Sequence, residues 1–283
     1  MSNTVIATGY QAQIAFAKET TYGTSPTSSA YSWYGQVEQA SITVDRQPIV
    51  IYRMDGSTPY PAHILYGTRK VDTTVDFYPQ DVGALTDMIN NVVSSSHSTV
   101  INFGNIGQAY TAFGGKANKV TFTGAMNAAL KCQIAYQNQN VSTSAPVGIT
   151  YPSDPGNTPF YFATESISLS NSLNVKVIDW NVTITRNLQR VYQFGQDYLR
   201  VLTPLVATAT GDFTVVLEDF TELSDVFNWS PETLSFTLGQ DAGNTTRYCN
   251  ITGAQLTQVP LTAPVQDYIE VKIPFTATGV TIV

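Results

Sequence analysis

Apolar side chains recur at every second position in several segments of the chain, which is the period of a half-buried β-strand. Ile42 and Val44 alternate with polar residues, and Trp180, Val182 and Ile184 do the same later in the chain. A strand with one apolar and one polar face is typical of an antiparallel sheet that packs on a core with one side only. The pattern therefore predicts a mainly β protein whose sheet turns its other face to water or to another subunit.

A later strand in each half places acids and threonines on this polar face. They alternate with apolar residues, so we expect them to share one surface of the sheet. The residues are Asp72, Thr74 and Asp76 in the first half and Asp212, Thr214 and Glu218 in the second.

The apolar period changes to three and four residues in one segment of each half, which indicates a short amphipathic helix. Val82, Leu85 and Met88 carry this pattern within 79–91, and 221–229 repeats it in the second half. Each half is thus expected to contain strands, one short helix and further strands.

Five blocks of the first half recur in the same order in the second half, which predicts an internal repeat. The matched pairs are Ile42–Arg46 with Val182–Arg186 (140 residues apart), Val71–Asp76 with Phe213–Glu218 (142), Leu85–Asn90 with Leu223–Asn228 (138), Phe122–Ala125 with Ile251–Ala254 (129), and Leu130–Tyr136 with Ile269–Phe275 (139). The alternative explanation is that strands rich in Thr and Val match by chance. The shared Leu-Thr-Asp and Leu-Ser-Asp sequences favour a true repeat.

A chain of 283 residues is long enough for two domains that each bury a core. The repeat predicts two tandem β-sandwich domains, each with one short flanking helix. Their ranges are 1–145 and 146–283, with a connector at 146–160 that is rich in Ser, Thr, Pro and Gly.

Each half also contains a long loop, at 47–65 and 187–204, that is too apolar to remain free in water. We expect these loops to bury their apolar side chains against a neighbouring subunit; the alternative is that each folds back on its own domain. The residues concerned are Tyr52, Met54 and Tyr60 in the first loop and Tyr192, Phe194 and Tyr198 in the second.

The composition argues against several classes of function. Charged residues make up only 12% of the chain and the net charge is −7, which disfavours a protein that grips nucleic acid through its phosphates. Cys132 and Cys249 are too few for a disulfide framework, and we expect both to be buried thiols. His63 and His97 are isolated, so we expect no catalytic residues, metal site or cofactor. No apolar stretch is long enough to anchor the chain in a membrane, and we expect no secretory signal.

The segment Glu19-Thr20-Thr21-Tyr22-Gly23-Thr24-Ser25-Pro26, preceded by Gln13–Lys18, resembles the N-terminal pattern of tailed-phage tail tube proteins. That pattern reads Glu-x-x-Tyr or Phe-Gly-Thr-x-Pro, and the order of the expected strands and helix is similar to the family's along nearly the whole chain. The resemblance implies a β-sandwich flanked by a helix, with subunits joined edge to edge into a barrel around a lumen. It also implies that rings stack through the long loop and the terminal arms.

The resemblance, combined with the repeat, implies a non-enzymatic tail tube subunit that forms trimeric rings with six domains each. Its partners would be itself, the tape measure, tail terminator and baseplate proteins, a sheath where one is present, and double-stranded DNA in transit. It would be assembled in the host cytoplasm and reside in the virion tail, and the polar sheet face would line the lumen. The alternatives are a baseplate hub or tail-completion component, and a carbohydrate-binding β-sandwich module.

Overall fold

The computed structural model describes most of the chain. The described residues are 12–27, 31–52, 61, 63–80, 83–90, 95–145, 149–154, 156–161, 166–169, 176–217, 232–238, 247–257 and 269–282. The protein is mainly β, as the alternation predicted.

The described residues of the first half form nine strands and one α-helix. They are β1 (Ala12–Lys18), β2 (Gln36–Arg46), β3 (Ile49–Ile51), β4 (His63–Leu65), β5 (Arg69–Tyr78), α1 (Gly83–Asn90), β6 (His97–Phe103), β7 (Gln108–Ala125), β8 (Lys131–Asn138) and β9 (Asn140–Ser142). A single 3₁₀ turn, Gly104–Ile106, joins β6 to β7. The helix lies within the segment expected from the three-and-four period, and its expected counterpart at 221–229 lies outside the described residues.

The second half provides the remaining described strands. They are β10 (Ser166–Leu169), β11 (Lys176–Thr185), β12 (Gln189–Tyr192), β13 (Leu199–Thr203), β14 (Thr208–Leu217), β15 (Glu232–Leu238), β16 (Arg247–Leu256), β17 (Ile269–Ala277) and β18 (Gly279–Ile282).

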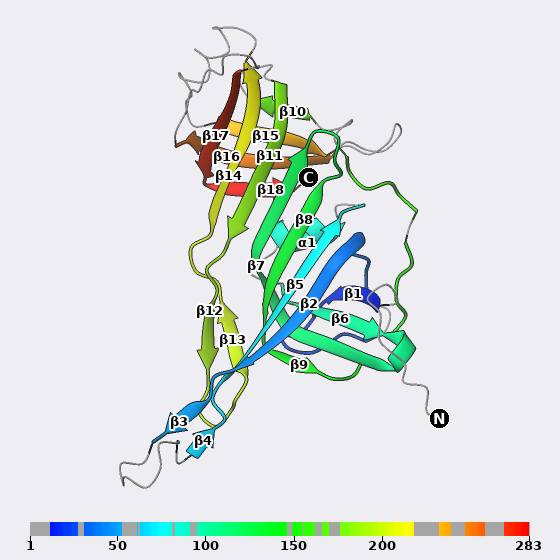
Figure 1. Cartoon of the computed structure of the whole chain (residues 1–283), viewed down its shortest axis with the longest axis vertical. Helices are drawn as coiled ribbons and strands as arrows, with labels where there is room; N and C mark the ends of the chain where they lie inside the picture. The colour runs from blue at the N-terminus through cyan, green and yellow to red at the C-terminus, as the bar shows by residue number, and fades with distance from the viewer. Residues whose placement is uncertain are drawn as a thin grey trace.

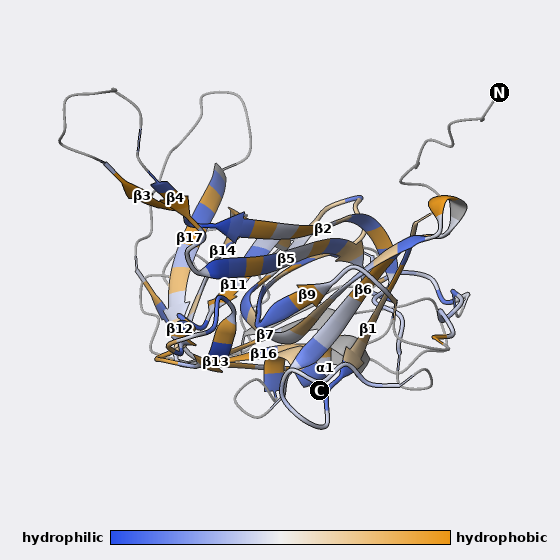
Figure 2. Ribbon diagram, turned by 90° about the horizontal axis from the view of Figure 1, so that it is seen from below, coloured by the Kyte–Doolittle hydropathy of each residue, from blue (hydrophilic) through white to orange (hydrophobic). Residues whose placement is uncertain are grey.

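Strands of both halves form one 14-stranded sheet, whose main path runs β10-β15-β16-β17-β14-β11-β7-β8-β5-β2 (Figure 1). All of its pairings are antiparallel, and β7 of the first half pairs directly with β11 of the second. The strand β7 spans 18 residues, so its first part pairs with β6 and β9 while its second part pairs with β8 and β11. It thereby belongs to two layers, which Figure 2 shows from the end of the molecule.

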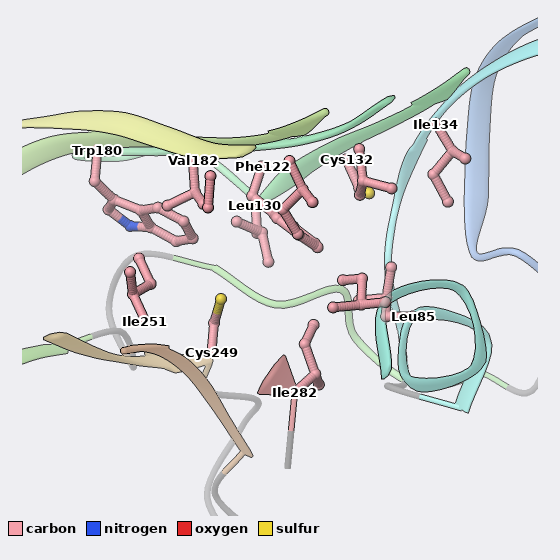
Figure 3. Close-up of a cluster of buried hydrophobic side chains, with 14 of the residues drawn as sticks. Leu85, Phe122, Leu130, Cys132, Ile134, Trp180, Val182, Cys249, Ile251 and Ile282 are labelled. Atoms are coloured by element: carbon pink, nitrogen blue, oxygen red, sulfur yellow. The ribbon is translucent and has the colours of Figure 1, made fainter. Parts of the chain in front are cut away.

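The core lies between this long sheet on one side and α1 with β15, β16 and β18 on the other (Figure 3). Phe122, Trp180 and Val182 point from the sheet into the core, where they meet Leu85 of α1 and Ile251 of β16. One continuous cluster of buried side chains therefore includes residues of both halves.

Two polar side chains tie the halves together at α1. Arg186, which follows β11, is buried and donates hydrogen bonds from Nη1 to the Ala117 carbonyl and from Nη2 to the Ile89 carbonyl, both at 3.0 Å. A cation at the carboxyl end of a helix also interacts favourably with the helix dipole. The side-chain amide of Asn90 donates a hydrogen bond to the Ile282 carbonyl, and its oxygen accepts one from the Ile282 N–H, as a neighbouring strand would.

Every pairing within the first half has a counterpart in the second. The pairs of the first half are β1–β6, β6–β7, β7–β9, β7–β8, β5–β8 and β2–β5. Their counterparts in the second half, in the same order, are β10–β15, β15–β16, β16–β18, β16–β17, β14–β17 and β11–β14. Even an irregularity recurs, because β2 is shifted between Val37 and Gln39 and β11 between Val177 and Asp179. The hairpins β3–β4 and β12–β13 occupy the same place in the two orders.

The pairings correct two of the five sequence matches. Thr111 pairs with Ser142, and Asn250 pairs with Thr281; both members of the second pair lie 139 residues after those of the first. β16 therefore corresponds to the first part of β7 and not to Phe122–Ala125. Gly114 and Gly253 agree with this, since both adopt a positive φ, +65° and +60°. Likewise, Val71 pairs with Asn138, and Ala209 pairs with Ala277, the counterpart of Asn138. Each residue of β5 therefore corresponds to the residue of β14 that lies 138 positions later, instead of 142.

Candidate assembly surfaces

The polar face of the long sheet carries the acids and threonines that the alternation placed there. Asp72, Thr74 and Asp76 of β5 alternate with the buried Val71, Thr73, Val75 and Phe77. Asp212 and Thr214 of β14 lie on the same face of the continuous sheet, as the register through β11, β7 and β8 requires. Glu218 lies outside the described residues.

These acids are partnered rather than free. Asp72 forms an ion pair with Arg190, and Asp212 Oδ1 lies 2.9 Å from Lys272 Nζ. Asp76 accepts a hydrogen bond from Gln133 at 2.8 Å, and Thr214, which is largely buried, donates one to Asp179 at 2.7 Å. The face is therefore of mixed charge and rich in hydroxyl and amide groups, with acids and bases side by side.

The strand β2 is the first-half end of the sheet, and no other described strand lies along its outer edge. An unpaired edge presents free N–H and C=O groups that can pair with another chain. The apolar side of β2 is also incompletely covered: Val44 is 44% exposed, whereas its counterpart Ile184 in β11, which is paired on both edges, is 6% exposed. A groove of about 580 Å³ opens between β1 and β2, where Ile14, Trp33 and Val37 form part of its wall.

The hairpin β12–β13 folds onto the first half of the same chain. Its Leu188, Leu199 and Leu202 are buried, and Tyr192 packs against them. Its polar groups also meet the first half: the Tyr192 hydroxyl donates to the Arg69 carbonyl at 3.3 Å, and the Arg69 amide donates to the Asp197 carbonyl at 2.7 Å. The 187–204 loop therefore packs against the other half of its own chain.

The hairpin β3–β4 has no such cover among the described residues, and it projects from the body as an apolar ribbon (Figure 2). Both of its faces are exposed, with Ile49 at 54%, Tyr52 at 68%, Ile64 at 67% and Tyr66 at 84%. Of the other loop residues singled out from the sequence, Phe194 is fully exposed and Tyr198 is partly buried, while Met54 and Tyr60 lie outside the described residues.

The N-terminal motif has a structural explanation, which sequence reasoning missed. Glu19 is 7% exposed, and its carboxylate accepts four hydrogen bonds. Oε1 accepts from Ser98 Oγ at 2.6 Å and from the Gly114 amide at 2.7 Å, while Oε2 accepts from Ser96 Oγ at 2.7 Å and from the Gly23 amide at 2.9 Å. The carboxylate thus joins the turn after β1 to β6 and to the bend of β7.

The same turn supports the surface that receives β12–β13. A side chain at Gly23 would collide with Gln139, whose amide donates to the Arg200 carbonyl of β13 at 3.3 Å. Burial raises the pKa of the neighbouring Tyr22 hydroxyl to about 12. The motif therefore stabilises the fold where the two halves meet.

The described residues contain no cluster of His, Cys, Asp or Glu suited to a metal ion. Cys132 and Cys249 are both buried free thiols, as expected from the sequence, and burial raises the pKa of Cys249 to about 12 and that of Cys132 well above its usual range. His97 is buried against Phe16 and Tyr136, and its ring nitrogens have no hydrogen-bond partner among the described residues. Within the described ranges, no helix is both long and apolar enough to cross a bilayer.

An antiparallel sheet whose edge is open among the described strands, together with an apolar hairpin on the surface, is typical of a subunit that assembles with other subunits. The chain belongs to the phage tail tube protein family, which matches residues 9–277. Proteins of this family are structural components of the virion tail rather than enzymes. The search for curated relatives gave no match.

Proposed function

We propose that this protein is the subunit of a tail tube in which three copies form a ring of six similar domains. The observation that carries the proposal is the β7–β11 junction, where two halves with the same strand pairing join edge to edge. β2 is the counterpart of β11, and its outer edge is open in the described part of the chain. If the same junction forms between copies, the outer edge of β2 pairs with the second half of the neighbouring copy, and the ring closes.

The proposed domains are 1–145 and 146–283, and the second begins with the connector 146–160. Both contribute the polar face of the same continuous sheet, so ring closure would surround a lumen with that face. Its mixed charge suits passage of DNA, because Lys131 and Lys272 pair with Glu38 and Asp212, and a surface with such compensated charges does not hold phosphates tightly. Asp72, Asp76, Asp212 and Thr214 would line this channel.

Stacked rings would conduct DNA from the capsid to the host. The fully exposed Phe194 at the turn between β12 and β13 is suited to contact the next ring. Further contacts with the tape measure, tail terminator, baseplate and any sheath belong to the same proposal, as does assembly in the host cytoplasm.

The test is negative-stain electron microscopy of the purified full chain, with mass photometry at low concentration. Hollow stacked rings with a trimer as the smallest oligomer support the proposal. A persistent monomer refutes it and favours a hub or tail-completion component.

The lumen assignment has its own test. Thr123 is exposed on the polar face, and Gln13 is exposed on β1 in the other layer. Because both natural thiols are buried, Thr123→Cys and Gln13→Cys each create one reactive site for a maleimide gold label. Gold inside the tube for Thr123→Cys and outside it for Gln13→Cys is expected; the reverse placement refutes the assignment.

A further inference from the structure

The two hairpins have the same place in the fold but opposite surroundings. The pairings make Val50, Tyr52 and Ile64 of β3–β4 the counterparts of Arg190, Tyr192 and Leu202 of β12–β13. Leu202 is 1% exposed, whereas Ile64 is 67% exposed. A water-exposed apolar hairpin of this kind is a binding surface that lacks its partner.

The surfaces on which the two hairpins could pack also differ in exposure, and the difference has the opposite direction. In the first half, residues beneath or beside β12–β13 are partly buried, and their second-half counterparts are exposed. The corresponding pairs are Arg69 and Ala207, Lys70 and Thr208, Asp72 and Thr210, and Gln137 and Thr276. Leu205 and Val206, at 54% and 78% exposure, extend the exposed surface with apolar groups.

We propose that β3–β4 packs on the second half of an adjacent copy, at the surface formed by Ala207, Thr208, Thr210 and Thr276. The contact repeats the one that β12–β13 makes on the first half of its own chain. It rests on the proposed ring, because the adjacent copy is the one whose second half continues the sheet beyond β2.

The chemistry of the contact differs from that of its counterpart. Within the chain, Arg190 forms an ion pair with Asp72. Between copies, the equivalent positions are Val50 and Thr210, so the contact is uncharged and mainly apolar. Burying apolar side chains contributes association free energy without the desolvation cost of an ion pair.

The direction of the contact follows from the same correspondence. The halves that β12–β13 connects are neighbours along the sheet, through β7 and β11. The equivalent contact of β3–β4 is therefore lateral, within one ring. The base of the 47–65 loop then holds copies together around the ring instead of stacking one ring on the next.

Cross-linking tests this arrangement directly. The double variant Val50→Cys with Thr210→Cys is assembled and treated with a bismaleimide whose spacer is about as long as an arginine side chain. The natural thiols are buried and do not compete. We expect links between copies that end at the trimer, because a lateral contact closes on itself. Asp72→Cys with Arg190→Cys is the matched control, and its link should stay within one chain.

The outcomes separate this proposal from the proposed function. Rings that assemble without a Val50→Cys to Thr210→Cys link refute the contact alone. Links that continue beyond three copies place the hairpin between rings and also refute it. A chain that never leaves the monomer refutes both.

A charge design gives an independent readout that does not rely on a reagent. Val50→Asp with Thr210→Asp places like charges at the contact and should raise the concentration needed for assembly by about tenfold or more, equivalent to ~1.4 kcal/mol. Val50→Arg with Thr210→Asp recreates the Arg190–Asp72 pair and should restore assembly. Circular dichroism melts of the monomers confirm that each variant is folded, and equal assembly of the two folded double variants refutes the contact.

Discussion

Replacing Glu19 tests whether the family's N-terminal motif is a structural element. Each carboxylate oxygen accepts one serine hydroxyl and one glycine amide. In Glu19→Gln, the side-chain oxygen can serve one such pair, and the NH₂ group faces the other. The serine can rotate its hydroxyl to accept, but the glycine N–H cannot, so either orientation of the amide leaves one backbone donor unsatisfied.

The expected cost follows from this count. An unsatisfied buried donor costs about 1–3 kcal/mol, and the remaining bonds lose their charge assistance, so we expect Glu19→Gln to lower the free energy of unfolding by about 3 kcal/mol. Glu19→Ala leaves both glycine amides without their acceptor and opens a cavity, and we expect about 4–5 kcal/mol. The matched control is Glu38→Gln, whose ion pair with Lys131 is nearly half exposed and should cost less than about 1 kcal/mol.

The assay is urea unfolding of the unassembled chain, followed by the fluorescence of its three tryptophans. The midpoint should fall in the order Glu38→Gln, Glu19→Gln, Glu19→Ala. A Glu19→Gln midpoint equal to that of Glu38→Gln would show that the carboxylate network contributes nothing, and the structural reading of the motif would be wrong.

Three further predictions concern buried groups. Burial lowers the pKa of His97 from 6.5 to about 4. Between these two pH values the unfolded chain binds more protons than the folded chain, so the free energy of unfolding should fall by about 3 kcal/mol as the pH drops from 6.5 towards 4. His97→Phe should flatten this pH dependence in unfolding curves, and an unchanged slope would assign the acid sensitivity to other groups. Cys132 and Cys249 should not react with a thiol reagent in the native protein and should both react after unfolding; a fast native reaction at either would contradict their burial. Arg186→Met removes the hydrogen bonds to the Ile89 and Ala117 carbonyls and should cost about 2–4 kcal/mol in unfolding free energy, whereas the exposed counterpart Arg46→Met should cost about 0.5 kcal/mol or less; equal effects would argue against the bridging role.

Local pattern was sufficient to predict much of this protein. Alternation identified the strands and the faces of Asp72 and Asp212, because the side-chain period of a strand is a property of the backbone. The three-and-four period located α1, and the match of Ile42–Arg46 to Val182–Arg186 has the register that the pairings support.

Only the tertiary structure decided the register of the other strands and the surroundings of the loops. The two incorrect matches are displaced by four and by ten residues, both even numbers, and an even displacement leaves every side chain on its original face. Alternation therefore cannot detect such an error, whereas hydrogen-bonded partners can. In the same way, the two loops are similarly apolar in sequence. Their surroundings differ because β11 places β12–β13 beside the first half of its own chain, while β3–β4 extends from β2, whose outer edge no other described strand covers.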